Sequence, residues 1–323
     1  MSNPLNDAQF IEISPPIFRK IAGQLPFDIY LRRAEGTYTK IFPKGERVDV
    51  DRLLNYEGKI DAFYVTQPDY RQYLLYVERM ATEFCTKPKS SSPDEILAIV
   101  KELTTHTMLE ISIKMQVDSL SLAHASQVVR GCIEALYRDP QTLVKVFVQM
   151  SKHPYVIRHS ITSAIFALLL AKAGKLESEK TLANVGMGAL LHDLGMSRLS
   201  FDAEDKDDLS AQDWKDLKEH PQIGSRLLDA VKGVSTEVRT IVMQHHEQPN
   251  GLGYPNGIRD KEIFLLAKIV AIADSFSALT SKRPFRTEPC TPTKALEIMS
   301  EDRGKFDPQL LKAFTKIFVK IKT

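Results

Sequence analysis

The stretch GMGALLHDLGMS, residues 186–197, decides the fold expected for this chain. It has the pattern of an apolar helix end that is followed directly by a histidine and an aspartate, His192 and Asp193. Its small residues permit close packing against a neighbouring helix, so the pair is expected to be buried. The stretch therefore predicts a helical domain with a buried His-Asp pair at the end of one helix.

Other histidines, before and after this pair, are spaced at intervals that suit a helical bundle. Five of the eight histidines lie at 159, 192, 220, 245 and 246, and Asp274 comes further along. The intervals from one group to the next are 33, 27, 25 and 28 residues, which is about one helix plus one loop. Successive helices could therefore present their side chains to one interior point, a common way of building metal sites in bundles. Taken singly, His220 is better explained as a surface or capping histidine, and only the set indicates a metal.

The surroundings of Asp274 support the same prediction. It lies in LLAKIVAIADSFSALT (265–280), an almost wholly apolar helix, where an unpaired carboxylate would be costly. A cation would remove that cost, and the alternative is a core acid paired with Lys268 or an arginine. Imidazole nitrogens with carboxylate oxygens suit iron, manganese or zinc better than a thiolate site would.

Composition excludes several classes of protein. The 43 basic and 41 acidic residues nearly balance, so nothing favours DNA, RNA or an anionic membrane as a partner. The three cysteines form no CxxC pair, which fits a reducing compartment. The start of the chain lacks an apolar run, and the stretch IFALLLA (165–171) is too short to span a bilayer. A cytoplasmic protein without a membrane span is expected.

The first 88 residues are expected to form a small α+β module. Apolar and polar residues alternate on both sides of Glu35-Gly36, which predicts a β-hairpin. A further strand is expected within 61–70, ending at Pro68, with a helix from Asp69 onward. This module precedes a part of the chain that is mainly helical.

The segment KPKSSSPDE, residues 87–95, is the best candidate for a linker because it is polar and breaks the periodicity. Its end, Ser92 and Pro93 followed by two acids, is a strong helix start. Residues 89–139 are expected to form linker helices broken near Asp139-Pro140, and residues 140–323 a domain of about six more helices.

Four segments resemble one known family. They are HDLGMS (192–197), HPQIG (220–224), HHEQPNGLGYPNGI (245–258) and AKIVAIADSFSALTSKRPFR (267–286). In this order and spacing they resemble the HD-GYP family, over roughly residues 140–320. The resemblance implies an all-helical HD-type bundle that hydrolyses the bacterial second messenger cyclic di-GMP to pGpG or GMP. It also implies two divalent metal ions, most often iron, with manganese or zinc as alternatives.

The resemblance assigns roles to individual residues. Asp193 would bridge the two metals at the catalytic centre, Arg283 and Arg286 would hold the substrate phosphate unless they are simply solvated, and Gly253, Tyr254 and Pro255 would shape a loop beside it. The implied metal ligands are His159, His192, Asp193, His220, His245, His246 and Asp274.

Several positions depart from the family pattern without removing a ligand. Met196 replaces a lysine, which removes a charge from the expected phosphate site. The other changes are Gln248 for arginine, Asn250 and Ser277 for aspartates, and Phe285 for tyrosine. Tyr155 replaces a glutamate that supplies an extra ligand in three-metal members, so two metals are expected.

Three functions remain open on the sequence. The first is a metal-dependent cyclic di-GMP phosphodiesterase with slow turnover. The second is a weak or inactive member that binds cyclic di-GMP as a sensor. The third is a hydrolase of another phosphate ester. Signalling proteins or a second copy of the chain are the expected protein partners.

Overall fold

The computed structural model describes residues 9–13, 18, 24–47, 56, 62–86, 93–114, 117–138, 155–201, 208–282 and 288–321. The chain divides into two compact units, Met1–Leu103 and Thr104–Thr323. Each unit is described by itself. The domain limits at residues 88 and 139 stay predictions.

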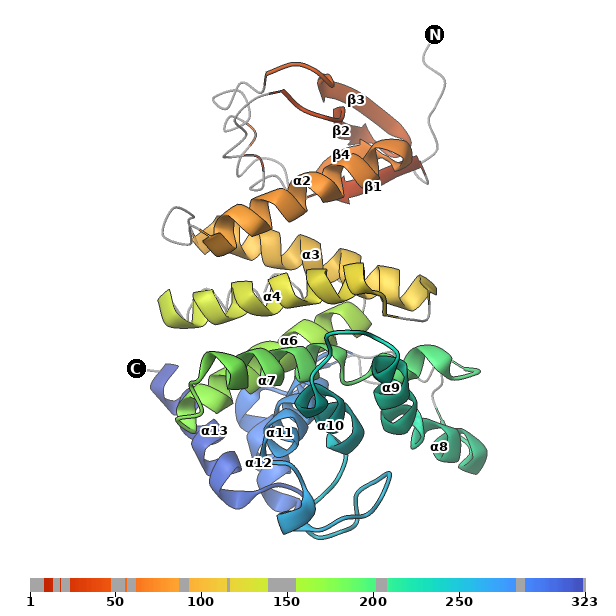
Figure 1. Cartoon of the computed structure of the whole chain (residues 1–323). Helices are drawn as coiled ribbons and strands as arrows, with labels where there is room; N and C mark the ends of the chain where they lie inside the picture. Colours follow the sequence, from red (N-terminus) through yellow and green to blue (C-terminus); the bar gives the residue numbers. More distant parts are fainter. Residues whose placement is uncertain are drawn as a thin grey trace. The chain divides into compact units, whose positions relative to one another are not determined.

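The N-terminal unit contains a four-stranded antiparallel sheet with the order β1-β4-β2-β3 (Figure 1). The predicted hairpin is confirmed: Glu35 and Gly36 form the turn, and Gly36 has the positive φ of 68° that glycine tolerates. The strands are β1 (Phe10–Ile13), β2 (Ile29–Ala34), β3 (Thr37–Phe42) and β4 (Phe63–Thr66).

Helix α2 (Gln67–Thr86) follows β4 directly. The strand ends before the predicted Pro68, which instead occupies the first turn of the helix. Proline is tolerated there because the first turn needs no backbone N–H. Tyr73 and Tyr76 of α2 pack against the buried rings of Phe18 and Phe27 to form the aromatic core of this unit.

Two helices follow the predicted linker. Helix α3 (Pro93–Lys114) begins at the predicted Pro93. Helix α4 (Ser119–Arg138) begins after Asp118, whose carboxylate accepts a hydrogen bond from the Ser121 backbone N–H at 2.8 Å. The predicted break at Asp139-Pro140 and the linker residues 87–92 lie outside the described residues.

The C-terminal unit is a helical bundle, which confirms the expected fold class. Helices α6, α7 and α11 pack on one another at its centre (Figure 1). After α4, the helices of this unit are α6 (Tyr155–Ala173), α7 (Glu179–Leu191), α8 (Ala211–Leu217), α9 (His220–Asp229), α10 (Thr236–Gln244), α11 (Leu265–Leu279), α12 (Pro292–Glu301) and α13 (Pro308–Ile321), with the short 3₁₀ helices η5 (Leu194–Arg198) and η6 (Asp260–Glu262).

Helix α6 is long and apolar enough to cross a membrane, but 78% of its apolar window is buried in the structure. Among the described residues, no second helix passes the same test. Phe166 of α6 contacts Phe276 of α11 and Phe314 of α13, all three buried. The apolar side chains of α6 therefore belong to the core of the bundle. Their hydrophobicity is only weak evidence that α6 spans a membrane.

Two glycines let η5 approach α9 closely. A Cβ atom added to Gly195 would lie 2.8 Å from the backbone nitrogen of Gly224 and closer still to the carbonyl oxygen of His220. Any side chain at position 195 would therefore push these backbone segments apart. This contact fixes the distance between Asp193, two residues before Gly195, and His220 at the start of α9.

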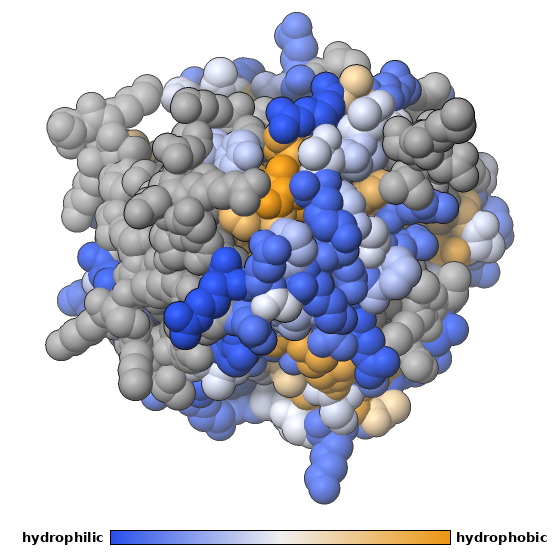
Figure 2. Space-filling model, turned by 90° about the horizontal axis from the view of Figure 1, so that it is seen from above, coloured by the Kyte–Doolittle hydropathy of each residue, from blue (hydrophilic) through white to orange (hydrophobic). Residues whose placement is uncertain are grey.

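The visible surface follows the usual pattern of a folded protein. On the face drawn in Figure 2, the coloured residues are mostly hydrophilic, and hydrophobic residues form small patches among them.

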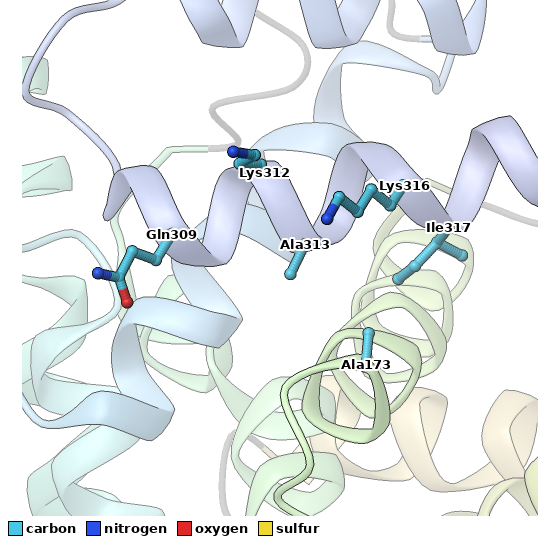
Figure 3. Close-up of a pocket in the computed structure, with 6 residues that line it drawn as sticks. All are labelled: Ala173, Gln309, Lys312, Ala313, Lys316 and Ile317. Atoms are coloured by element: carbon cyan, nitrogen blue, oxygen red, sulfur yellow. The ribbon is translucent and has the colours of Figure 1, made fainter.

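A separate pocket lies between α13 and the end of α6 (Figure 3), and its lining includes Ala173 of α6 and Lys316 and Ile317 of α13. Ala173 is 14 positions after His159 on the same helix, about 21 Å along its axis, so this pocket is distinct from the site described next.

Candidate metal centre

Four buried histidines from four helices meet at one point of the helical unit. His159 lies in the second turn of α6, His192 and His245 cap the C-terminal ends of α7 and α10, and His220 begins α9. Each is at most 2% exposed. The Nε2 atoms of His159 and His192 are 3.2 Å apart, as are those of His220 and His245.

Backbone carbonyls orient three of these imidazoles. The Nδ1 atoms of His192, His220 and His245 lie 2.7–2.8 Å from the carbonyl oxygens three residues earlier, those of Ala189, Leu217 and Val242. A ring that donates its Nδ1–H to a carbonyl presents an unprotonated Nε2 on the other side. All three Nε2 atoms point to the shared centre, which is the arrangement required of metal ligands.

A hydroxyl takes the place of the carbonyl at His159. Its Nδ1 atom lies 3.0 Å from the Oγ of Ser277, which in turn contacts the Oγ1 of Thr162. Ser277 is fully buried in α11. In the sequence, Ser277 stands only as a serine where the family pattern has an aspartate. In the structure, its hydroxyl is a hydrogen-bond partner of His159, a predicted ligand.

The carboxylate of Asp193 faces two groups of histidines with its two oxygens. Oδ2 lies 3.3 Å from Nε2 of His192 and 3.6 Å from Nε2 of His159. Oδ1 lies 3.4 Å from Nε2 of His220 and 3.8 Å from Nε2 of His245. Two sets of donor atoms, each compact enough for one metal ion, therefore share this residue. They are Asp193 with His159 and His192, and Asp193 with His220, His245 and His246.

Asp274 of α11 completes the constellation. Its Oδ1 lies 3.0 Å from Nε2 of His159, and its Oδ2 lies 3.9 Å from Nδ1 of His246. The alternative partner considered for Asp274, Lys268, contacts Asp260 and Asp307 instead. The Lys268 alternative is therefore wrong, while an arginine partner stays an open alternative, and all seven predicted ligands lie together at one site.

Burial keeps most of the imidazoles neutral. It lowers the pKa of His159 and of His220, and it lowers the pKa of His245 well below its usual value. Burial, together with the nearby His220, lowers the pKa of His246 to about 3. Neutral imidazoles are the form that binds a metal ion.

The two carboxylates are held in the ionised form. Burial alone would raise the pKa of Asp193 and of Asp274, but hydrogen bonds and charges from the surrounding histidines hold both well below the usual range. The same carboxylates raise the pKa of His192 well above its usual value, against the effect of burial. Two negative charges, one buried and one half-buried, among imidazole nitrogens need positive charge beside them. The donor set therefore fits divalent metal ions.

Among the seven candidate ligands, Asp193 and His246 are the most exposed to solvent. The side chains of Asp193 and His246 are 25% and 27% exposed, while those of the four buried histidines are at most 2% exposed. The ring of Tyr254 lies 4.6 Å from that of His246, so the tyrosine lies beside one of these more exposed ligands. Among the described residues, Asp193, His246 and Tyr254 therefore form the side of the centre on which candidate ligands are exposed to solvent.

The loop that carries Tyr254 is fastened to the residues after the paired histidines. The backbone N–H of Tyr254 donates to the carbonyl of His246 at 3.1 Å, and the Tyr254-Pro255 peptide is cis. A Cβ added to Gly253 would lie 2.6 Å from the Cα of Glu247, so only glycine fits there. The predicted Gly-Tyr-Pro segment thus lies directly beside the metal ligands.

Glu247 holds the far side of the same loop, a role that sequence patterns do not indicate. It is 2% exposed, and its two carboxylate oxygens accept hydrogen bonds from the backbone N–H groups of Asn256 at 2.7 Å and Ile258 at 3.1 Å. From the sequence, a glutamate within a polar loop is expected to be exposed to solvent. The structure shows that the following loop folds back over Glu247 and buries it.

Replacing Glu247 by glutamine should loosen this loop. The amide offers one acceptor oxygen, so one of the two N–H groups, at Asn256 or Ile258, loses its partner, at a cost of about 1–3 kcal/mol. Faster amide hydrogen exchange at Asn256 to Ile258 and a lower melting temperature are expected. Glu262→Gln is the matched control, because the exposed Glu262 accepts one such bond from Arg259. Equal exchange in both variants would contradict the role of Glu247.

Of the remaining residues that the sequence places at the site, some lie outside the described residues, and Met196 and Tyr155 lie close to the candidate ligands. Arg283, Phe285 and Arg286 lie outside the described residues. Met196 is half-buried in η5, one turn after Asp193. The ring of Tyr155 stacks on that of His159 at 5.0 Å, so it packs on a ligand.

This fold and donor set place the chain in a known class. A model of the HD domain family matches residues 145–310, which is just over half of the chain. The chain therefore belongs to the HD domain family. The match includes all seven residues of the centre, and the resemblance to HD-GYP proteins is confirmed by the relatives that follow.

Curated relatives share the helical unit. The chain is 33% identical over 200 residues to a cyclic di-GMP phosphodiesterase of Pseudomonas aeruginosa, covering 61% of this chain and 48% of that relative. It is 32% identical over 168 residues to a 3'3'-cGAMP-specific phosphodiesterase of Vibrio cholerae, covering 51% and 36%. The chain thus spans about half or less of the length of these relatives.

A solved structure has a similar fold along nearly the whole chain. It is Bd1817 of Bdellovibrio bacteriovorus, described as an HDG"Y"P protein. The TM-score is 0.67 at 20% identity, with 96% of this chain and 99% of that chain covered. At this identity the likeness concerns the fold, and it includes the N-terminal unit.

Proposed function

We propose that this chain hydrolyses cyclic di-GMP to pGpG or GMP at a centre that holds two divalent metal ions, with iron as the first candidate and manganese or zinc as alternatives. The observation that carries the proposal is Asp193, whose two oxygens face two separate groups of histidines. The names of the relatives support a cyclic dinucleotide as the substrate.

In this proposal the seven candidate ligands divide between two ions. His159 and His192 would hold one ion, and His220, His245 and His246 would hold the other, with Asp193 placed to contribute to both. Asp274 lies within reach of both sides, with one oxygen near His159 and the other near His246. Bound divalent ions supply Lewis acidity toward a phosphate and make water acidic enough to react near neutral pH.

The rest of the site positions the substrate. The phosphate enters by the open side, past Asp193 and His246, and the ring of Tyr254 lies beside its path. Arg283 and Arg286 are proposed to neutralise the phosphate, as the family resemblance implies. Met196 brings no charge to this path, so slow turnover is part of the proposal.

The N-terminal unit is proposed to receive a signal, and signalling proteins or a second copy of the chain are the proposed partners. The cytoplasm is the proposed location, because a second messenger is the substrate. A catalytically silent sensor is the alternative function that Met196 favours.

The test combines metal content with product analysis. Protein purified under low oxygen should contain two metal ions per chain and should convert cyclic di-GMP to pGpG or GMP at well below about 10 per second. Met196→Lys should raise turnover about tenfold or more, since a charge-assisted contact contributes roughly 1.5–3 kcal/mol. Met196→Leu is the matched control and should leave turnover low.

Each other outcome points to a different function. Binding of cyclic di-GMP without any product would establish the sensor alternative. Faster loss of 3'3'-cGAMP than of cyclic di-GMP would assign the other dinucleotide. Hydrolysis of a simple phosphodiester, with neither dinucleotide bound, would leave a hydrolase of another ester.

A further inference from the structure

A lysine that no motif includes lies at the open side of the metal centre. Lys218 is the C-cap of α8, two residues before His220. Its ammonium group lies 6.0 Å from the centre of the Tyr254 ring, and that ring lies 4.6 Å from the ring of His246. Lys218 therefore lies next to the tyrosine that packs on His246, one of the two more exposed candidate ligands.

The ammonium group of Lys218 is available to a ligand. The residue is exposed, and no carboxylate of the described residues forms an ion pair with it. Lys268, Lys294 and Lys305 of the same unit each contact an acidic side chain. An unpaired cation beside an opening formed by metal ligands is placed to meet an anion, and a phosphate is the anion that such a centre handles.

The backbone fixes the position of Lys218 relative to the ligands. The Lys218 N–H donates to the carbonyl of Trp214 at 3.1 Å, and the carbonyl of Leu217 accepts from Nδ1 of His220. The segment that orients a ligand imidazole thus also carries the lysine. These hydrogen bonds hold the backbone of Lys218 beside the centre and leave its side chain free to move.

We propose that Lys218 binds a phosphate group of the substrate at the mouth of the metal centre. This places a positive charge beside Tyr254, near the solvent-exposed candidate ligands, whereas Met196 supplies none. The inference rests on the proposed function and adds to it a residue that contacts the substrate. The competing explanation is that Lys218 merely covers the face of Tyr254, a cation–π contact that arginine would preserve and glutamine would not.

The test separates phosphate binding from packing. Lys218→Gln, Lys218→Arg and the control Lys215→Gln are compared with the unchanged full-length protein, all with two metals per chain confirmed by elemental analysis. Lys215 is an exposed lysine of the same helix. Affinity for cyclic di-GMP is measured by equilibrium dialysis at several salt concentrations, and KM and kcat are measured separately.

Lys218→Gln is expected to weaken binding and to raise KM about tenfold, with little change in kcat and none in metal content. The salt dependence of binding should become shallower, because one charge contact to phosphate is lost. Lys218→Arg should retain both affinity and salt dependence, and Lys215→Gln should match the unchanged protein.

Two results would overturn the inference. If Lys218→Gln binds like Lys215→Gln, Lys218 does not contact the substrate. If affinity falls while the salt dependence stays the same, the lysine only supports Tyr254. Should the unchanged protein neither bind nor hydrolyse cyclic di-GMP although it holds two metals, the proposed function fails and the inference falls with it.

Discussion

Replacing Asp193 with alanine should strip both metal ions from the protein and abolish hydrolysis. Its two oxygens face both groups of histidines, so one substitution removes a ligand from each proposed ion. It also removes one of the two negative charges that would offset the charge of the metals. Loss of an outer partner of a metal ligand already lowers affinity roughly 10–100-fold, and loss of a shared ligand should exceed this.

The matched comparison is His220→Ala. His220 belongs to one group of donors only, so this variant should keep one ion tightly bound and lose the other. Elemental analysis after dialysis against a weak chelator measures the difference, with circular dichroism as the check on folding. Asp229→Ala, at an exposed ion pair with Arg239, should keep both ions. Equal metal loss in the Asp193 and His220 variants would refute the shared-ligand assignment.

Gly195→Ala should damage the centre without touching a ligand. The added methyl group would meet the backbone of Gly224 at 2.8 Å and the carbonyl of His220 at a shorter distance still. Backbone atoms cannot rotate away as a side chain can, so η5 and α9 must separate. Overpacking costs about 1–3 kcal/mol in general, and this contact should reach the upper end of that range.

Metal affinity should fall with stability in the Gly195 variant, because Asp193 and His220 move apart together with their backbones. Thermal unfolding and metal content are the two measurements. Gly174→Ala is the control, since a methyl group there meets only carbonyl oxygens at 3.4 and 3.5 Å. A Gly195 variant that melts and binds metal like the Gly174 variant would show that η5 and α9 adapt freely.

The candidate ligands could be predicted from sequence because they recur at regular intervals, singly or as adjacent pairs, on or beside successive helices. His192, His220 and His245 all lie where a helix begins or ends. In the sequence, such a position is recognised as a polar residue next to a run with apolar residues at helical spacing. The spacing alone then implies convergence in a bundle. For the same reason, the helix start at Pro93 and the hairpin turn at Gly36 were predictable from local signals.

The residues that support the ligands could not be predicted in this way. Ser277 meets His159 from 118 positions away, and a serine in an apolar helix carries no sign of that partner. Glu247 becomes buried only because the following loop returns over it. The contact of Lys218 with Tyr254 likewise depends on how two loops approach each other. Such contacts follow from tertiary packing, which local sequence patterns do not encode.

Because the candidate ligands come from several helices, bound ions would make the stability of the bundle depend on metal supply. His159 of α6, His192 of α7 and His220 of α9 come from distant parts of the chain, so bound ions would join these helices as a cross-link does. A ligand that binds only the folded state adds about 2.7 kcal/mol of stability at a free concentration 100 times its Kd. The abundance of the folded protein in the cell would then rise and fall with the available metal, independently of its substrate.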